Sequence, residues 1–271
     1  MIILYHANCN DGSASALAAW MKLGDQGHRY IPVIHGNPPP PEVIGEDVII
    51  VDFCYPRDIL LNIKAKSILI LDHHISAQKD LAAPFPDNSN ITAFFNMNKS
   101  GAVLSWEYFH PEQPLPLFYQ YIQDRDIWTK KHQQSTWLSF GLGVFSQQFR
   151  DWQTLIDDPA QLEQAIENGK AVYTFVNIEA DKIIASRQYQ NIAGFNVPVI
   201  NGPGFMVSDA LHKVLDLEPN APFAASYSDL LSQNLRVYSL RSDNNREDVS
   251  VIAKSLGGGG HRNASSFSVK L

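Results

Sequence analysis

The chain has 271 residues, of which 45 % are hydrophobic and 18 % charged, a composition that excludes a disordered protein and allows one large domain or two modest ones. The formal net charge of −7 and the lack of a Lys/Arg run argue against binding of long duplex nucleic acid, because such binding depends on phosphate neutralisation. The apolar runs are too short to span a bilayer, and a strand-like segment follows Met1 directly, where a signal peptide would have a basic region. Only Cys9 and Cys54 are cysteines, which rules out a disulfide framework and fits a reducing compartment. We therefore expect a cytoplasmic protein without a signal peptide or membrane contact.

Strands and helices alternate over the first 75 residues. The expected strands cover residues 2–5, 30–35, 47–53 and 67–71, and the expected helices cover 13–23 and 57–65. Continuous apolar strands separated by helices are typical of a parallel sheet covered on both faces. In such a sheet the active site lies beyond the carboxyl ends of the strands.

The second half of the chain changes from helices to strands. Helical spacing of apolar residues predicts helices over 100–110, 115–123, 137–145 and 162–187. Strand signals return at 197–201, 223–227, 235–240 and 267–271, with helices expected near 207–215 and 249–255. The sequence therefore predicts an α/β protein with two domains, residues 1–188 and 189–271.

Polar side chains follow the expected strands where those strands end. They are His6, Asp11, Asp52, Asp72, His73 and His74, and Asp124 follows the apolar segment 117–122. Because parallel strands bring their carboxyl ends to one edge of the sheet, these side chains could converge. Carboxylates and imidazoles together suit Mn²⁺, with Mg²⁺, Co²⁺ or Fe²⁺ as alternatives, and without a cation their clustering would be repulsive.

At these residues the chain resembles the DHH phosphoesterase superfamily, and the resemblance covers nearly the whole length. The triplet Asp72-His73-His74 matches the motif that names the superfamily, and Asp124-Arg125-Asp126 is similar to its fourth motif. The segment from Gly257 to Ala264 looks like the signature of the associated DHHA1 domain. The resemblance implies a parallel-sheet DHH catalytic domain followed by a smaller, mixed-sheet DHHA1 domain that binds substrate.

The resemblance also implies a role for each matching residue. Two manganese ions are expected, bridged by Asp52, with His74 contacting the attacking water or the phosphate and Asp72 orienting the histidines. The implied metal ligands are His6, Asp11, Asp52, His73 and Asp124.

The first motif departs from the family pattern, which usually has two aspartates two positions apart. The second corresponds to Asp11, and the first falls on Cys9. Cys9 is either a thiolate ligand, which would shift the metal preference towards Zn²⁺, Co²⁺ or Fe²⁺, or a spectator beside a weak or empty site. For Cys54, a buried structural thiol is expected.

Several residues are candidates for binding the phosphate of a substrate. Four consecutive glycines, 257–260, could form a loop whose N–H groups face an anion, with His261 and Arg262 adding charge-assisted bonds. Arg241 is similar in placement to a substrate-binding Arg of DHHA1 domains and could equally be a solvated charge at the end of a strand. Ser100 opens a helix, where it could help to hold a phosphate or act as an ordinary N-cap. The substrate-binding candidates are Ser100, Arg241, Gly258, Gly259, Gly260, His261 and Arg262.

The predicted chemistry is in-line attack on phosphorus by a hydroxide that the metal ions generate from water. The expected substrates are short oligoribonucleotides or small linear or cyclic nucleotides, since a long polyanion would require more Lys and Arg. Hydrolysis of polyphosphate or of a phosphomonoester is the alternative reaction. A degenerate module that binds nucleotides without cleaving them is the alternative outside enzymes, and an accessory RNA-binding subunit would need a basic surface. The sequence does not predict an oligomeric state.

Overall fold

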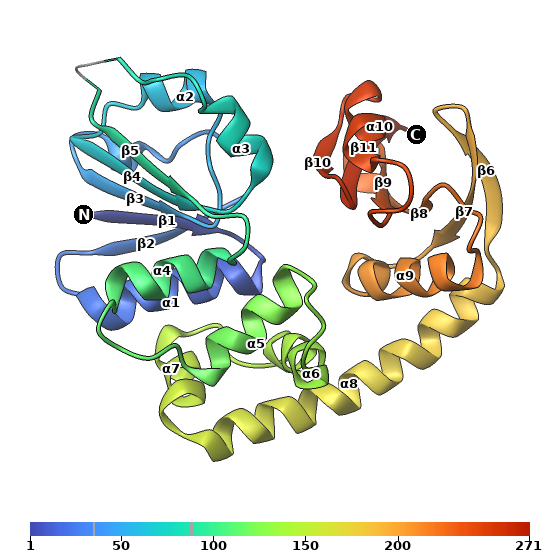
Figure 1. Ribbon diagram of the computed structural model, residues 1–271, viewed down its shortest axis with the longest axis horizontal. Helices are drawn as coiled ribbons and strands as arrows, with labels where there is room; N and C mark the ends of the chain where they lie inside the picture. The colour runs from blue at the N-terminus through green and yellow to red at the C-terminus, as the bar shows by residue number, and fades with distance from the viewer. Residues whose placement is uncertain (35, 87–88) are drawn as a thin grey trace. The chain divides into compact units, whose positions relative to one another are not determined.

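A computed structural model describes residues 1–34, 36–86 and 89–271 of the chain (Figure 1). These residues divide into two compact units, Met1–Tyr173 and Thr174–Leu271. The division falls inside the long helix α8 (Pro159–Ala185), whereas the sequence suggested a boundary at residue 188. No helix of the described residues has both the length and the apolarity needed to cross a bilayer.

The first unit holds a parallel sheet and most of the helices. Its described elements are β1 (Ile2–His6), α1 (Asn10–Leu23), β2 (Arg29–Val33), η1 (Pro41–Val43), β3 (Asp47–Val51), α2 (Arg57–Asn62), β4 (Ser67–Asp72), α3 (Ile75–Asp80), β5 (Ile91–Phe95), α4 (Gly101–Phe109), α5 (Leu117–Asp126), α6 (Gln133–Leu142), α7 (Phe149–Asp157) and the first part of α8.

The sheet of the first unit has the order β2-β1-β3-β4-β5, and every neighbouring pair in it is parallel. Helices α1 and α4 pack on one face, and α2 and α3 cover the other (Figure 1). Ile3 is buried with Ala19 and Phe109 on the first face, and Leu4 is buried with Leu60 on the second. Apolar residues at consecutive strand positions are needed because both faces are covered. The predicted parallel sheet is confirmed.

Some elements of the first unit differ from the sequence prediction. Strand β5 was not expected, because its side chains alternate between exposed and partly buried and so lack a continuous apolar run. Helix α6 begins four residues before the predicted position 137, because backbone N–H groups just before it bond to a carboxylate of α5. The predicted strand 30–35 ends at Val33, and its last residue, His35, lies outside the described residues.

The second unit is built on a mixed sheet. After the end of α8 its described elements are β6 (Gln188–Ile192), β7 (Phe195–Asn201), η2 (Gly204–Met206), α9 (Val207–Leu217), β8 (Ala224–Leu230), η3 (Leu231–Gln233), β9 (Leu235–Arg241), α10 (Val249–Ser255), β10 (Gly259–His261) and β11 (Ala264–Lys270). The order is β10-β11-β9-β8-β7-β6, with β7 and β8 parallel and the other pairs antiparallel. Val197, Phe223, Leu240 and Ile252 lie in its apolar core. The predicted combination of a parallel sheet and a separate mixed sheet is confirmed.

Candidate metal centre

The carboxyl edge of the parallel sheet carries the candidate residues of the first unit. His6 is the last residue of β1, Asp52 follows β3 directly, and Asp72 ends β4. Strand β1 has β2 on one side and β3 on the other, so His6 and Asp52 flank the point where the strand order reverses. Ligands of open α/β sheets bind at this type of switch point.

Asp52 lies between two histidines. Its Oδ1 is 3.2 Å from Nε2 of His73, and its Oδ2 is 3.6 Å from Nδ1 of His6. The backbone of Asp52 has φ +62°, a left-handed conformation that Asp tolerates better than most residues and that is often found at functional sites. Burial opposes ionisation, but the electrostatic attraction of His6 and the hydrogen bond with His73 outweigh it and hold the pKa of Asp52 well below its usual range.

Asp11 is clamped by the start of helix α4. Its Oδ2 accepts the N–H of Gly101 at 2.6 Å, and its Oδ1 accepts the N–H of Ala102 at 3.1 Å. Its Oδ2 also lies 3.8 Å from Nε2 of His73. A Cβ on Gly101 would stand 2.6 Å from Cβ of Asp52 and 2.9 Å from Oδ2 of Asp11, so this position requires glycine. The helix N-terminus therefore holds a carboxylate of the cluster.

Asp126 joins the cluster from helix α5. Its Oδ2 is 3.6 Å from Nε2 of His73, is buried, and has no hydrogen-bond partner among the described residues. Burial raises the pKa of Asp126 to about 6, with His73 opposing this rise and Asp52 adding to it. No role was expected for Asp126 from its place in the fourth motif.

Asp124, the ligand expected from the fourth motif, has a different environment. Its carboxylate accepts four hydrogen bonds, from the hydroxyls of Thr129 and Ser135 and from the N–H groups of Lys131 and His132. No group of convergent ligand atoms found among the described residues includes Asp124. Residues two apart on a helix point in nearly opposite directions, about 200° around the axis. The geometry therefore favours Asp126 over Asp124 as the ligand from this motif.

Asp72 organises the two histidines that follow it. Its fully buried Oδ1 accepts the N–H of His73 at 2.7 Å and Nδ1–H of His74 at 2.6 Å. Burial alone would lower the pKa of His74, but the bond to Asp72 and the charges of Asp72 and Asp52 raise it to about 9. The hydrogen bond holds the His74 ring, while the role of Asp72 at a metal centre stays a prediction.

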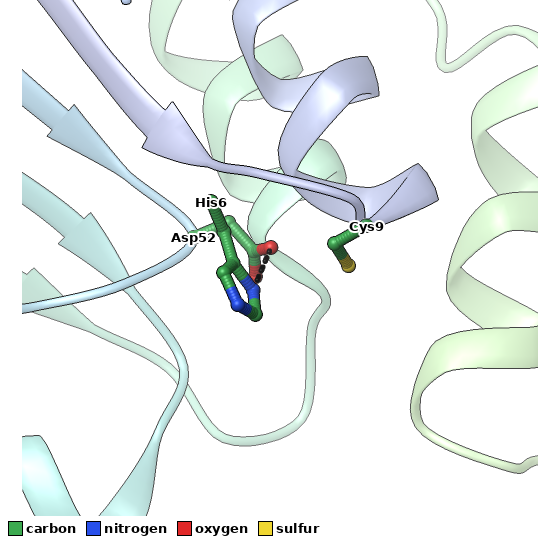
Figure 2. A group of neighbouring side chains, drawn as sticks. All are labelled: His6, Cys9 and Asp52. Carbon is green, nitrogen blue, oxygen red and sulfur yellow. Dashed lines mark ion pairs between the residues drawn. The ribbon is translucent and has the colours of Figure 1, made fainter. Parts of the chain in front are cut away.

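Cys9 lies at the N-cap of α1, beside His6 and Asp52 (Figure 2). One ligand atom from each of these three residues lies within 4.8 Å of the other two. Burial raises the pKa of the Cys9 thiol well above its usual value, and the nearby Asp52 and Asp11 raise it further. The thiol is therefore protonated unless a cation neutralises the carboxylates around it.

These residues fit a centre that holds divalent metal ions. Three overlapping groups have convergent ligand atoms: His6/Cys9/Asp52, Asp52/His73/His74 and Asp11/His73/Asp126. Asp52 and His73 each occur in two of the groups; the two oxygens of the Asp52 carboxylate could contact two ions, whereas Nε2 of His73 can bind only one. Buried oxygens of Asp52 and Asp126 have no hydrogen-bond partner among the described residues, and a cation would satisfy both.

Ser100 has the geometry of a helix N-cap. Its hydroxyl accepts the N–H of Val103, and its own N–H donates to Oε1 of Gln123. Ser100 is fully buried, and the next two N–H groups of α4 bond to Asp11. The start of this helix therefore binds a side chain of the protein at the place where the sequence analysis considered a phosphate.

The glycine run of the second unit ends a helix and begins a strand. The N–H of Gly258 donates to the carbonyl of Ala253 and the N–H of Gly257 donates to the carbonyl of Lys254, which is a Schellman cap of α10. Gly257 has φ +81° and supplies the left-handed residue of this cap. Gly259 and Gly260 belong to β10, which pairs with β11. The N–H groups of Gly257 and Gly258 therefore bond within the second unit, and binding of a phosphate by Gly258, Gly259 and Gly260 stays a prediction.

The charged candidates of the second unit contact the protein itself. Arg262 donates to the carbonyls of Asn244 and Arg246, and its Nη1 lies 3.5 Å from Oδ2 of Asp248. Arg241, at the end of β9, donates to Oγ of Ser208 at 2.8 Å. His261 ends β10 and is exposed. Their assignment to substrate remains a proposal.

Comparison with known sequences gives one relative without an assigned activity. No family model matches the chain. An uncharacterised protein of Acanthamoeba polyphaga mimivirus is 34 % identical to this chain in an alignment 287 residues long. The alignment covers 97 % of this chain and 66 % of the viral protein. The chain thus spans slightly less than two thirds of the length of this relative.

Comparison with solved structures shows the fold. The DHH domain of a protein described as a member of a ribosomal protein family matches with a TM-score of 0.59 and 14 % identity, over 98 % of this chain and 81 % of that one. A pGpG-specific phosphodiesterase from Vibrio cholerae matches with a TM-score of 0.54 and 15 % identity, over 100 % and 93 %. RecJ from Thermus thermophilus, in complex with Mn²⁺, matches with a TM-score of 0.51 and 14 % identity, over 99 % and 49 %. The chain has the fold of the DHH superfamily, as its motifs indicated.

Proposed function

We propose that this protein is a metal-dependent phosphodiesterase that hydrolyses short oligoribonucleotides or small nucleotides. The observation that carries the proposal is the close approach of two donor groups, which provides for two neighbouring divalent ions. The groups are His6/Cys9/Asp52 and Asp11/His73/Asp126, and Oδ1 of Asp52 lies 3.2 Å from Nε2 of His73. Mn²⁺ is the proposed metal for the group with two carboxylates and one imidazole. The proposed ligands are His6, Cys9, Asp11, Asp52, His73 and Asp126.

The side chains around this centre suit phosphoryl transfer. Divalent ions, when bound, lower the pKa of water and neutralise the charge of the phosphate. Nδ1 of His74 donates to Asp72 at 2.6 Å, and Asp72 raises the pKa of His74 in the metal-free protein, so we assign His74 to donate a hydrogen bond to a phosphate oxygen. Asp11 and Asp126 provide further carboxylates near Nε2 of His73, at 3.8 and 3.6 Å. No covalent enzyme intermediate is required.

A cavity next to Cys9 supports a nucleotide substrate over a polyphosphate. Its volume is about 510 Å³, within the usual range for small-molecule sites, and all of its lining residues belong to the first unit. Its lining includes the aromatic residues Tyr5 and Phe149 and the amide residue Asn8, whereas Lys and Arg are absent from this described lining. Aromatic rings and amides suit a base and sugar, and a polyphosphate would require cations. The Vibrio cholerae protein of the same fold, described as pGpG-specific, agrees with this choice.

The test compares Asp52→Asn with Asp47→Asn, which changes an aspartate at the opposite end of the same strand. Metal-free protein receives Mn²⁺, alone and together with Co²⁺, and a 5′-labelled RNA dinucleotide, and mononucleotide release is followed. We expect release by the wild type and by Asp47→Asn only when Mn²⁺ is present, and no release by Asp52→Asn. Cleavage of polyphosphate or a phosphomonoester in place of the dinucleotide would replace the proposed substrate class. Binding of the dinucleotide without cleavage under any metal would indicate a degenerate nucleotide-binding module.

A further inference from the structure

We propose that Cys9 is a thiolate ligand and that the His6/Cys9/Asp52 position binds a softer ion, Zn²⁺, Fe²⁺ or Co²⁺, than the neighbouring position does. This inference rests on the metal centre of the proposed function. It concerns the chemical identity of one of the two ions, which depends on a residue where this chain differs from the pattern of the superfamily it resembles.

The three donors come from separate parts of the first unit and meet at one place. His6 ends β1, Cys9 begins α1, and Asp52 follows β3 (Figure 2). Their ligand atoms lie within 4.8 Å of one another. Ligands bound to one tetrahedral ion at about 2.0–2.3 Å are roughly 3.3–3.8 Å apart, so small side-chain rotations bring all three onto one ion.

Asp52 gives independent evidence for a cation at this place. It is 1 % exposed, and its Oδ2 has no hydrogen-bond partner among the described residues. The same oxygen faces His6, whose Nδ1 is 3.6 Å away. A buried carboxylate oxygen without a hydrogen bond is costly, and an ion held by Asp52, His6 and Cys9 removes that cost.

The two cysteines of the chain have different surroundings. Cys54 packs against an apolar core cluster, and its thiol donates to the carbonyl of Tyr55. Cys9 instead stands among His6, Asp52 and Asp11, and its sulfur accepts the backbone N–H of Gly12. A metal ion in this position converts the thiol to a thiolate, because a coordinated thiol loses its proton.

The donor sets predict different metals for the two positions. Thiolate, imidazole and carboxylate at His6/Cys9/Asp52 favour Zn²⁺, Fe²⁺ or Co²⁺. Two carboxylates and one imidazole at Asp11/His73/Asp126 favour Mn²⁺ or Mg²⁺. The two positions are therefore expected to hold unlike ions.

The test is a Co²⁺ titration of metal-free protein followed by absorption spectroscopy. The variants are Cys9→Ser, Cys9→Asp and, as the matched control, Cys54→Ser. Asp and Ser are favoured at a helix N-cap, the position of Cys9, so both substitutions are compatible with α1. Circular dichroism verifies the fold of each variant before titration.

We expect the wild type and Cys54→Ser to show a near-ultraviolet band from thiolate-to-cobalt charge transfer. Cys9→Ser and Cys9→Asp should lose this band and keep the weaker visible bands of cobalt bound by nitrogen and oxygen. Visible bands without charge transfer in the wild type would overturn the proposal, and so would loss of the band in Cys54→Ser alone. No cobalt binding by any variant would overturn it together with the metal centre. A thiolate band in a protein that cleaves no phosphodiester would support this inference while the proposed function failed.

Discussion

The assignment of Asp126 rather than Asp124 to the metal centre makes a prediction about two aspartates that are two residues apart. Asp124 is only 4 % exposed, and its carboxylate accepts four hydrogen bonds. Burial opposes ionisation of this carboxylate, but the hydrogen bonds lower its pKa to about 2. Asp124→Asn removes the charge that these bonds stabilise. A shift of about two units from the ordinary value corresponds to roughly 2–3 kcal/mol of stability. We therefore expect Asp124→Asn to destabilise the metal-free protein by about 2 kcal/mol.

The sign of this effect sets its pH dependence. Because the folded pKa of Asp124 is depressed, its stabilisation is fully present above the unfolded value near 4 and is lost as the pH falls towards about 2. Asp126 has the opposite shift, since burial raises its pKa to about 6. Its ionised carboxylate therefore opposes folding of the metal-free protein at neutral pH. Asp126→Asn should leave stability in EDTA unchanged or increase it by up to about 3 kcal/mol.

The assay is urea unfolding of the wild type and both variants, first in EDTA and then with Mn²⁺. An ion at 100 times its dissociation constant adds about 2.7 kcal/mol to the stability of the protein that binds it. Asp124→Asn should keep this metal-dependent gain and Asp126→Asn should lose most of it. The reasoning would be refuted if Asp124→Asn lost the gain while Asp126→Asn kept it, or if Asp126→Asn were the less stable variant in EDTA.

Three further predictions concern the supports of the site and of the second unit. Gly101→Ala should abolish metal binding measured by isothermal titration, because the new Cβ would stand 2.6 Å from Cβ of Asp52; retained binding would show that the two segments can separate. Asp72→Asn should lower the pKa of His74 from about 9 towards its ordinary value, as followed by NMR titration of the metal-free protein; an unchanged pKa would contradict the role of the pair. In the wild type the stabilisation from this raised pKa is complete below about pH 6.5 and is lost as the pH rises through about 9. Gly257→Ala should destabilise the protein to urea by about 1 kcal/mol, because φ is +81° there, and should leave metal binding unchanged; a neutral effect on stability would argue against the helix cap.

The strands and the meeting of the first-unit candidate ligands could be predicted where a local pattern carried the information. Continuous apolar runs identified β1, β3 and β4, because strands buried on both faces have no polar alternation. The polar residues at their ends were then candidates for one edge of the sheet, and His6, Asp52 and His73 do lie together there. The DHH triplet and the alternating elements were also enough to predict the fold that the solved structures show.

Other features depended on contacts between residues far apart in the chain. Sequence spacing could not choose between Asp124 and Asp126, because the direction in which each points depends on how α5 packs. It could not show that α4 uses its first N–H groups to hold Asp11, ninety residues earlier, or that Gly101 is required by that approach. The glycine run was read as an anion loop because four glycines are compatible with many conformations. The conformation of the run is determined by the pairing of β10 with β11 and by the cap of α10, because a glycine has no side chain that would favour one conformation locally.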